Sequence, residues 1–217
     1  MSLPKSYQEA VLVCLKLGIG FIWIDSLCIF QDSQDDWERE AMTMQDVYGN
    51  SYLNICTAAA ANSTEESFLG RSKGILKILM VSTTWEKSSR DSLFLYYDGA
   101  LNDDIAESPL RHRAWVYQEW YLSPRSLILS QNQLWWHCRE FLANEENRYG
   151  NLEFQRFDWL KVNNNVDIPQ STEYEGGMMR SFRFWFEHVE AYMNMNLSKE
   201  ADRMIAFSGI VSSFGQS

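Results

Sequence analysis

A tryptophan and a glutamate four positions apart, Trp115 and Glu119, are the pair in this sequence with the clearest potential for chemistry. We expect residues 113–122 to form a helix, and residues four apart on a helix share a face. On such a face the Trp115 ring would stack on a flat ligand. The Glu119 carboxylate would bind a sugar or stabilise a developing cation. Arg113, with two further arginines nearby, would add positive charge suited to a phosphate. Spacing alone favours a simpler alternative, in which Trp115 belongs to the core and Glu119 pairs with an arginine.

A second candidate is Asp25, which follows the apolar run Phe21 to Ile24. The run has the composition of a strand buried on both faces. In open α/β sheets, ligands bind beyond the carboxyl ends of the strands, where Asp25 and Ser26 would lie. A carboxylate there can hold ribose hydroxyls or orient a partner, and the plainer alternative is that Asp25 caps a turn. Cys28 has no base beside it, so we expect a buried structural thiol.

The four cysteines lie far apart in sequence, at positions 14, 28, 56 and 138. Without a paired spacing they predict neither a metal site nor a disulfide framework. Reduced, buried thiols are typical of a cytoplasmic protein. His137 and Cys138 fall in an expected strand and would point to opposite faces, so His137 is expected in the core.

The charge balance disfavours several function classes, although it leaves room for a local basic patch. The chain has 29 acidic and 19 basic residues and a net charge of −10, which opposes binding to nucleic acid or an anionic membrane. No apolar stretch reaches the ~18 residues of a membrane helix, and no leader peptide opens the chain. We therefore expect a cytoplasmic protein with neither nucleic-acid nor membrane partners.

Hydrophobic periodicity and capping signals predict the elements of the fold. The expected helices cover residues 4–18, 33–48, 113–122 and 180–195 and a segment capped by Ser198, and the expected strands cover 21–24, 52–58, 75–81, 93–97, 126–130 and 134–138. A capping box at Ser6 and Glu9 would start the first helix, and Ser33 would cap the second. The strand–helix–strand order within residues 21–58 predicts a βαβ unit and a parallel sheet.

Composition along the chain suggests one α/β core with an interruption. Residues 1–142 would form the core, and residues 143–179 would form a polar excursion or mobile loop. Residues 180–217 would supply C-terminal helices that pack on the same domain.

Several runs along the chain resemble the fungal heterokaryon-incompatibility (HET) domain. They are Trp23-Ile24-Asp25-Ser26-Leu27-Cys28-Ile29, Arg113-Ala114-Trp115 with Gln118-Glu119, Leu134-Trp135-Trp136 with Cys138, and Asp202-Arg203 with Ala206-Phe207-Ser208-Gly209. The matching segments follow the family's order along nearly the whole chain.

The resemblance implies a role in fungal self/non-self recognition and in programmed cell death during incompatibility. It also implies distant kinship with TIR domains, and hence a TIR-like, flavodoxin-like α/β sandwich with a mainly parallel sheet plus C-terminal helices. Some TIR domains cleave NAD at the nicotinamide–ribose bond with a helical glutamate in a Trp-Cys-x-x-Glu setting, to which Trp115 to Glu119 is similar. This implies that Glu119 is catalytic and that Asp25, Ser26, Arg113 and Trp115 bind NAD as substrate, with no cofactor required.

One departure from the family favours a second interpretation. The family opens with a strand similar to Leu-Ser-Tyr-x-Trp-Gly, and no such segment precedes residue 4, so we expect an N-terminally incomplete core. The alternative to an NAD glycohydrolase is therefore a non-catalytic module that signals by self-association or by binding a regulatory protein.

Overall fold

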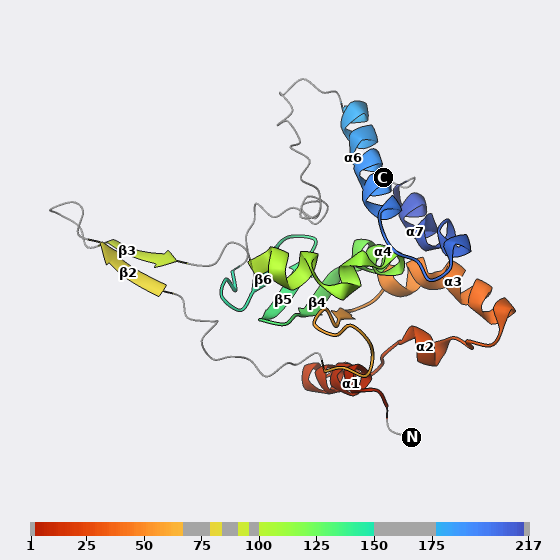
Figure 1. The fold of residues 1–217 in the computed structure, drawn as a ribbon, viewed down its shortest axis with the longest axis horizontal. Coiled ribbons are helices and arrows are strands. Elements are labelled where there is room, and N and C mark those ends of the chain that lie inside the picture. Colours follow the sequence, from red (N-terminus) through yellow and green to blue (C-terminus); the bar gives the residue numbers. More distant parts are fainter. Residues whose placement is uncertain (1–2, 67–78, 84–90, 96–99, 150–176, 215–217) are drawn as a thin grey trace.

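The structure is a computed structural model that describes residues 3–66, 79–83, 91–95, 100–149 and 177–214 (Figure 1). Over these residues the chain is a mixed α/β protein. Its helices and strands are α1 (Lys5–Leu17), α2 (Asp25–Cys28), α3 (Gln34–Gly49), β1 (Asn54–Cys56), β2 (Leu79–Thr83), β3 (Asp91–Leu95), α4 (Ala114–Leu122), β4 (Arg125–Leu129), β5 (Leu134–Cys138), β6 (Leu142–Asn144), α6 (Gly177–Met193) and α7 (Ile205–Phe214). Short π or 3₁₀ turns cover Asn102–Ala106, Pro109–His112 and Glu200–Asp202.

The main sheet has four strands in the order β1-β4-β5-β6. Strand β1 pairs in parallel with β4, placing Asn54 opposite Ser126, whereas β4–β5 and β5–β6 are antiparallel. The hairpin expected at residues 126–138 is confirmed, and β6 was not expected. The prediction of a mainly parallel sheet is wrong for these strands, because short turns connect β4, β5 and β6 and such turns favour antiparallel neighbours. Among the neighbouring strands of this sheet only β1 and β4 are parallel, and the crossover connection between them contains α4.

The expected strand at residues 21–24 is also absent, and with it the βαβ unit over 21–58. These residues connect α1 to α2 outside the sheet, and the Phe21 side chain is 95% exposed. A short apolar run does not by itself distinguish a strand from other structures. Here Trp23 instead packs edge-on against Tyr48, with 5.9 Å between the ring centroids.

The first two major helices form where the sequence predicts them, but only one of the two expected caps exists. Ser33 caps α3 by accepting a hydrogen bond from the backbone of Asp36. The predicted capping box of α1 is wrong, because Pro4 holds the N-cap position and the Ser6 hydroxyl donates to the carbonyl of Ser63. Gly18 ends α1 with φ of 70°, the left-handed conformation that glycine adopts without strain.

The C-terminal part follows the prediction with one correction. Helix α6 covers the predicted segment 180–195 except for its last two residues. Ser198 does not cap a final α-helix, because a 3₁₀ turn intervenes and α7 begins at Ile205. Strands β2 and β3 form a separate antiparallel pair displaced by a few residues from the expected ranges. Most of the excursion expected at residues 143–179 lies outside the described residues. No helix in the described part of the chain is long and apolar enough to cross a membrane.

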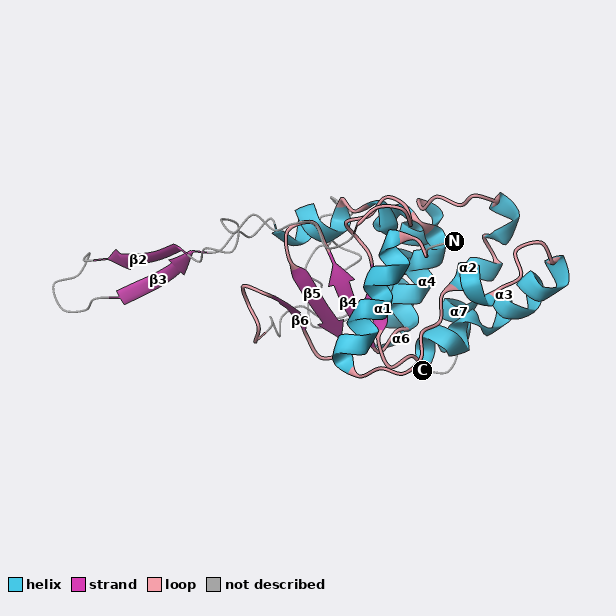
Figure 2. Cartoon of the chain, turned by 90° about the horizontal axis from the view of Figure 1, so that it is seen from below, coloured by secondary structure: helices cyan, strands magenta, loops and turns pink. Residues whose placement is uncertain are grey.

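Helices α3, α4 and α7 pack on one another beside the sheet (Figure 2). The centre of this packing is a close approach of α7 to α4, where the backbone N–H of Gly209 donates to Oε1 of Gln118 at 3.0 Å. A Cβ atom at Gly209 would lie 2.9 Å from that oxygen, 2.9 Å from Cβ of Gln45 and 3.0 Å from Cδ1 of Leu122. Only glycine allows the helices to approach this closely.

We predict that Gly209→Ala lowers the free energy of unfolding by about 1–3 kcal/mol, because the added methyl overpacks the contact among α3, α4 and α7. The gain in helix propensity from alanine, about 1 kcal/mol, offsets only part of this cost. Denaturant titration measures the change. Gly49→Ala is the matched control, since no atom lies within 4 Å of its Cβ position. Equal stability of the two variants would contradict the close approach.

Candidate functional site

A cavity of about 450 Å³ lies between α1, the segment before α2, the end of α3, β1 and the first turns of α4. Small-molecule sites occupy roughly 300–1,000 Å³. Four of its lining residues are Asp25, Tyr48, Arg113 and Glu119, which come from separate parts of the sequence. The fold therefore brings three of the residues predicted from sequence into one cavity.

Helix α4 supplies Glu119, and the face of the helix on which Glu119 lies directs this residue to the cavity. Val116, Glu119 and Trp120 line the cavity, whereas Tyr117 and Gln118 are buried away from it. The Glu119 side chain is partly accessible through the cavity. It is thus available to a bound molecule while most of its surface is removed from bulk water.

The pKa of Glu119 is raised to about 7 from its ordinary value of 4.5. Burial contributes most to this rise because it disfavours the charged form, and the negative charge of Asp25 adds to it. The positive charge of Arg113 and a hydrogen bond from Tyr48 act in the opposite direction. Near neutral pH the carboxyl is therefore divided between its protonated and ionised forms.

Tyr48 is the polar partner of Glu119 that sequence analysis did not identify. It lies in the last turn of α3, four residues after the buried Met44. Burial, followed by the charge of Glu119, raises the pKa of Tyr48 well above its usual range, so the phenol remains a donor. The available signal was its position in the last helical turn, just before Gly49, where a hydroxyl can reach beyond the helix.

Asp25 begins α2 and is exposed. Its Oδ1 accepts a hydrogen bond from the backbone of Ser26 at 2.6 Å, as the turn-capping interpretation anticipated. The same residue also lines the cavity and acts on Glu119 through its charge. The turn-capping interpretation of Asp25 is therefore confirmed, whereas its expected position beyond the end of a strand is wrong, because residues 21–24 form no strand.

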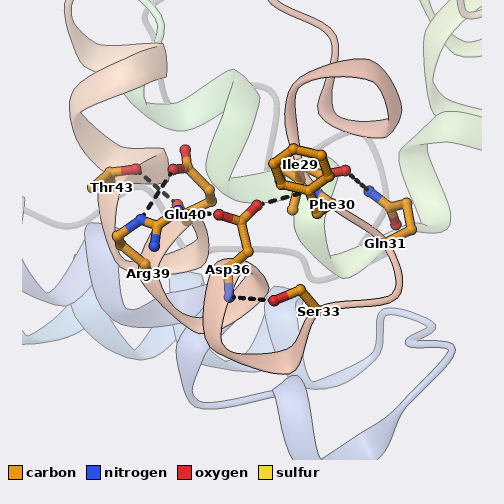
Figure 3. A network of polar contacts seen from close by, with 8 residues as sticks. All are labelled: Ile29, Phe30, Gln31, Ser33, Asp36, Arg39, Glu40 and Thr43. Carbon is orange, nitrogen blue, oxygen red and sulfur yellow. Dashed lines mark hydrogen bonds and ion pairs between the residues drawn. The ribbon is translucent and has the colours of Figure 1, made fainter.

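A polar network fixes the connection that carries Asp25 onto α3 (Figure 3). Asp36 is its centre: Oδ2 accepts from the backbone of Phe30 at 2.9 Å, and the other carboxylate oxygen is paired with Arg39. The side chain of Gln31 donates to the carbonyl of Ile29 at 3.1 Å. These contacts hold the end of α2 against the start of α3.

Two of the predicted binding residues lie outside the cavity lining. The Ser26 hydroxyl shares a hydrogen bond of 2.6 Å with Tyr7, which itself lines the cavity. The Trp115 ring packs edge-on against Trp37, with 6.3 Å between the centroids, beside the core shared by α4 and α7. The structure therefore does not bring Trp115 and Glu119 to the same ligand-accessible space.

The cysteines differ in burial: Cys14 and Cys56 are buried, Cys138 is half-buried and Cys28 is exposed. Cys56 lies at the cavity wall, where Trp120 Nε1 donates to its sulfur at 2.7 Å and burial raises the pKa of the thiol. Such a thiol stays protonated and is a poor nucleophile. Cys28 is exposed, so the expectation that it is buried is wrong. His137 is buried, as predicted. In the described parts of the chain, no group of three or more His, Cys, Asp or Glu residues is placed to hold a metal ion.

The charges around Glu119 make a direct prediction. Asp25→Asn removes a like charge and should lower the pKa of Glu119, whereas Arg113→Gln removes an opposite charge and should raise it. Carboxyl-carbon NMR titration of the two variants and the wild type measures both shifts. Shifts of the same sign in the two variants would contradict this arrangement.

Comparison with known proteins adds one match. The family model described as "Heterokaryon incompatibility protein (HET)" matches residues 1–119, more than half of the chain and including Asp25, Arg113 and Glu119. No curated protein and no solved structure gives a significant match. The chain belongs to the heterokaryon incompatibility (HET) family.

Proposed function

We propose that this HET-family protein acts in incompatibility by hydrolysing the nicotinamide–ribose bond of NAD⁺ in the cavity around Glu119, in the manner of TIR domains. One observation carries the proposal: a partly buried glutamate with a raised pKa faces a small-molecule-sized cavity beside Asp25 and Arg113. Perturbed carboxyls of this kind concentrate at catalytic sites.

The chemistry suits these groups. The bond between the ring nitrogen and ribose C1′ breaks, and its electron pair leaves with nicotinamide and neutralises the pyridinium charge. C1′ becomes oxocarbenium-like, and the Glu119 carboxylate stabilises that positive charge. Water then adds to C1′ and loses its proton, giving ADP-ribose, nicotinamide and H⁺. Because the leaving group is already cationic, no strong general acid is needed.

The remaining charged groups have complementary roles in this proposal. The carboxylate of Asp25 accepts hydrogen bonds from ribose hydroxyls, and the guanidinium of Arg113 binds the pyrophosphate through its positive charge. Tyr48 donates to Glu119 and favours its ionised, reactive form. Arg113 also supports that form through its charge.

We predict that Glu119→Gln lowers kcat for NAD⁺ cleavage by about 10²-fold or more, because the amide carries no charge to stabilise the cation. Release of nicotinamide, measured by chromatography at high protein concentration, is the readout. Glu40→Gln is the matched control, since Glu40 is also partly buried but does not line the cavity. Absence of cleavage by the wild type at every protein concentration would refute the proposal.

The pH profile should follow the ionisation of the same carboxyl. With a pKa of about 7 for Glu119, kcat should rise between pH 6 and pH 8 as the reactive anion forms. Asp25→Asn should move this rise to lower pH, because it lowers the pKa of Glu119. A profile that falls over this range would show that the protonated form is the reactive one.

A second candidate function is self-association of a non-catalytic module, and exposed apolar side chains favour it. Several large apolar residues near the N-terminal helices are more than half exposed: Leu15, Leu17, Phe21, Leu27 and Phe30. Isolated exposed apolar residues are ordinary, but several within a short stretch are typical of interaction surfaces.

For this candidate we predict that the wild type forms oligomers in a concentration-dependent way and that Leu15→Ser with Phe30→Ser abolishes them. Neither residue lines the cavity, so loss of assembly would be separable from loss of a catalytic residue. Light scattering during size-exclusion chromatography gives the mass. Met204→Ser, at an 80% exposed position on another part of the surface, is the control. A strict monomer at all concentrations would exclude the candidate.

A further inference from the structure

Helix α2 carries Asp25 to the cavity although it is too short to form by itself. It has four residues, and none of them is buried. Isolated helices shorter than about 12 residues are marginal in water, so contacts with neighbouring elements must support this one. No residue from 20 to 28 is buried, so packing supplies little of that support. The polar contacts of this segment therefore decide where Asp25 lies.

Hydrogen bonds tie α2 to the helices on both sides of it. On the α1 side, the phenol of Tyr7 and the hydroxyl of Ser26 share a hydrogen bond of 2.6 Å. On the α3 side, Asp36 accepts from the backbone of Phe30, two residues beyond α2 (Figure 3). The backbone N–H of Ser26 donates to Oδ1 of Asp25 at 2.6 Å. Two short hydrogen bonds therefore lead from Tyr7 to the carboxylate of Asp25.

Tyr7 lines the cavity together with Asp25 and Glu119 but does not act on Glu119 directly. The titratable groups that interact with Glu119 come from four parts of the chain: Asp25, Tyr48, Cys56 and Arg113. Tyr7 is outside this set, so loss of its hydroxyl reaches Glu119 through the position of Asp25. Trp23 also holds the segment, by its contact with Tyr48, but a change there would disturb a direct partner of Glu119.

We propose that Tyr7 is a positioning residue of this site, which holds the carboxylate of Asp25 at the cavity through its hydrogen bond to Ser26. The inference rests on the proposed function only for the role of Asp25 towards ribose hydroxyls. One net hydrogen bond changes an equilibrium about five- to tenfold. Without this bond α2 leaves its place more often, and the charge of Asp25 moves away from Glu119 and from any ligand.

The direction of the change at Glu119 distinguishes positioning from a local effect of the missing hydroxyl. When Tyr7→Phe releases Asp25, a like charge leaves the surroundings of Glu119 and the pKa of Glu119 falls. Loss of a polar hydroxyl from the cavity wall would by itself make these surroundings less polar and raise that pKa. A fall therefore identifies the positioning effect.

Carboxyl-carbon NMR titration of Glu119 in Tyr7→Phe and in Ser26→Ala tests the inference. Both variants should lower the pKa of Glu119, by no more than Asp25→Asn does. Ser26→Thr keeps the hydroxyl and should leave this pKa as in the wild type. In the Asp25→Asn background, Tyr7→Phe should lower it no further, because the charge through which Tyr7 acts is gone. Tyr149→Phe is the matched control, since Tyr149 is 95% exposed and does not line the cavity.

Amide hydrogen exchange measures the hold on α2 independently of the charge at Glu119. The backbone N–H groups of residues 27 to 29 donate to the carbonyls of Ile24 and Asp25 within this turn. Their exchange should become about five- to tenfold faster in Tyr7→Phe and in Ser26→Ala, because local opening of α2 becomes more frequent.

Three results would each overturn the inference. The first is a pKa of Glu119 that rises or stays unchanged in Tyr7→Phe. The second is a fall in this pKa that persists in the Asp25→Asn background, which would show that Tyr7 does not act through Asp25. The third is unaltered exchange of the α2 amides in both Tyr7→Phe and Ser26→Ala.

Turnover distinguishes this inference from the proposed function. If NAD⁺ is the substrate, Tyr7→Phe should also raise KM, because Asp25 then binds the ribose less often. If the wild type cleaves NAD⁺ but Tyr7→Phe changes neither KM nor the pKa of Glu119, the inference fails and the function stands. If the wild type does not cleave NAD⁺ but Tyr7→Phe lowers the pKa of Glu119, the function fails and the positioning role of Tyr7 stands.

Discussion

Helix α4 connects the core to the cavity, and its position depends on the close approach of α7 at Gly209. The hydrogen bond from Gly209 to the buried Gln118 satisfies a side chain that would otherwise be costly to bury, and it fixes the rotation of α4 about its axis. One face of α4 then packs against α3 and α7, and the adjacent face presents Glu119 to the cavity. A small rotation of α4 would move Glu119 away from Tyr48 and Asp25. The packing of three helices thus determines the electrostatics of the site, although none of the residues at the close approach lines it.

The same geometry explains why Glu119 is neither an ordinary surface carboxylate nor a neutral buried acid. Burial and Asp25 raise its pKa, and Arg113 and Tyr48 limit the rise to a value near 7. Each of these partners comes from a different segment, so the value reflects the tertiary fold and not the helix. Asp25 in turn depends on the contacts of Asp36 that anchor the start of α3. The site therefore depends on the contacts that position α2 and α3 as well as on α4.

Local signals predicted much of the fold and only part of the site. The Ser33 cap, the Gly18 stop and the 3.6-residue periodicity located α1 and α3 well, because those signals act within a few residues. The apolar run at residues 21–24 was misassigned because its surroundings, not its composition, keep it out of the sheet. Glu119, Asp25 and Arg113 were identified from sequence as candidate site residues, but Tyr48 was not. The position of Tyr48 beside Glu119 depends on contacts between residues that are far apart in the chain, and local periodicity carries no information about such contacts.

Near neutral pH the Glu119 carboxyl in the cavity lowers the stability of the fold. A carboxyl whose folded pKa exceeds its unfolded value of 4.5 stabilises the fold below that pH, and this stabilisation is lost as the pH rises through about 7. Near neutral pH the ionised Glu119 therefore opposes folding. An apolar side chain at this position would avoid that cost. A cation bound beside Glu119 would offset it, so the binding of such a ligand would restore stability that the free protein lacks.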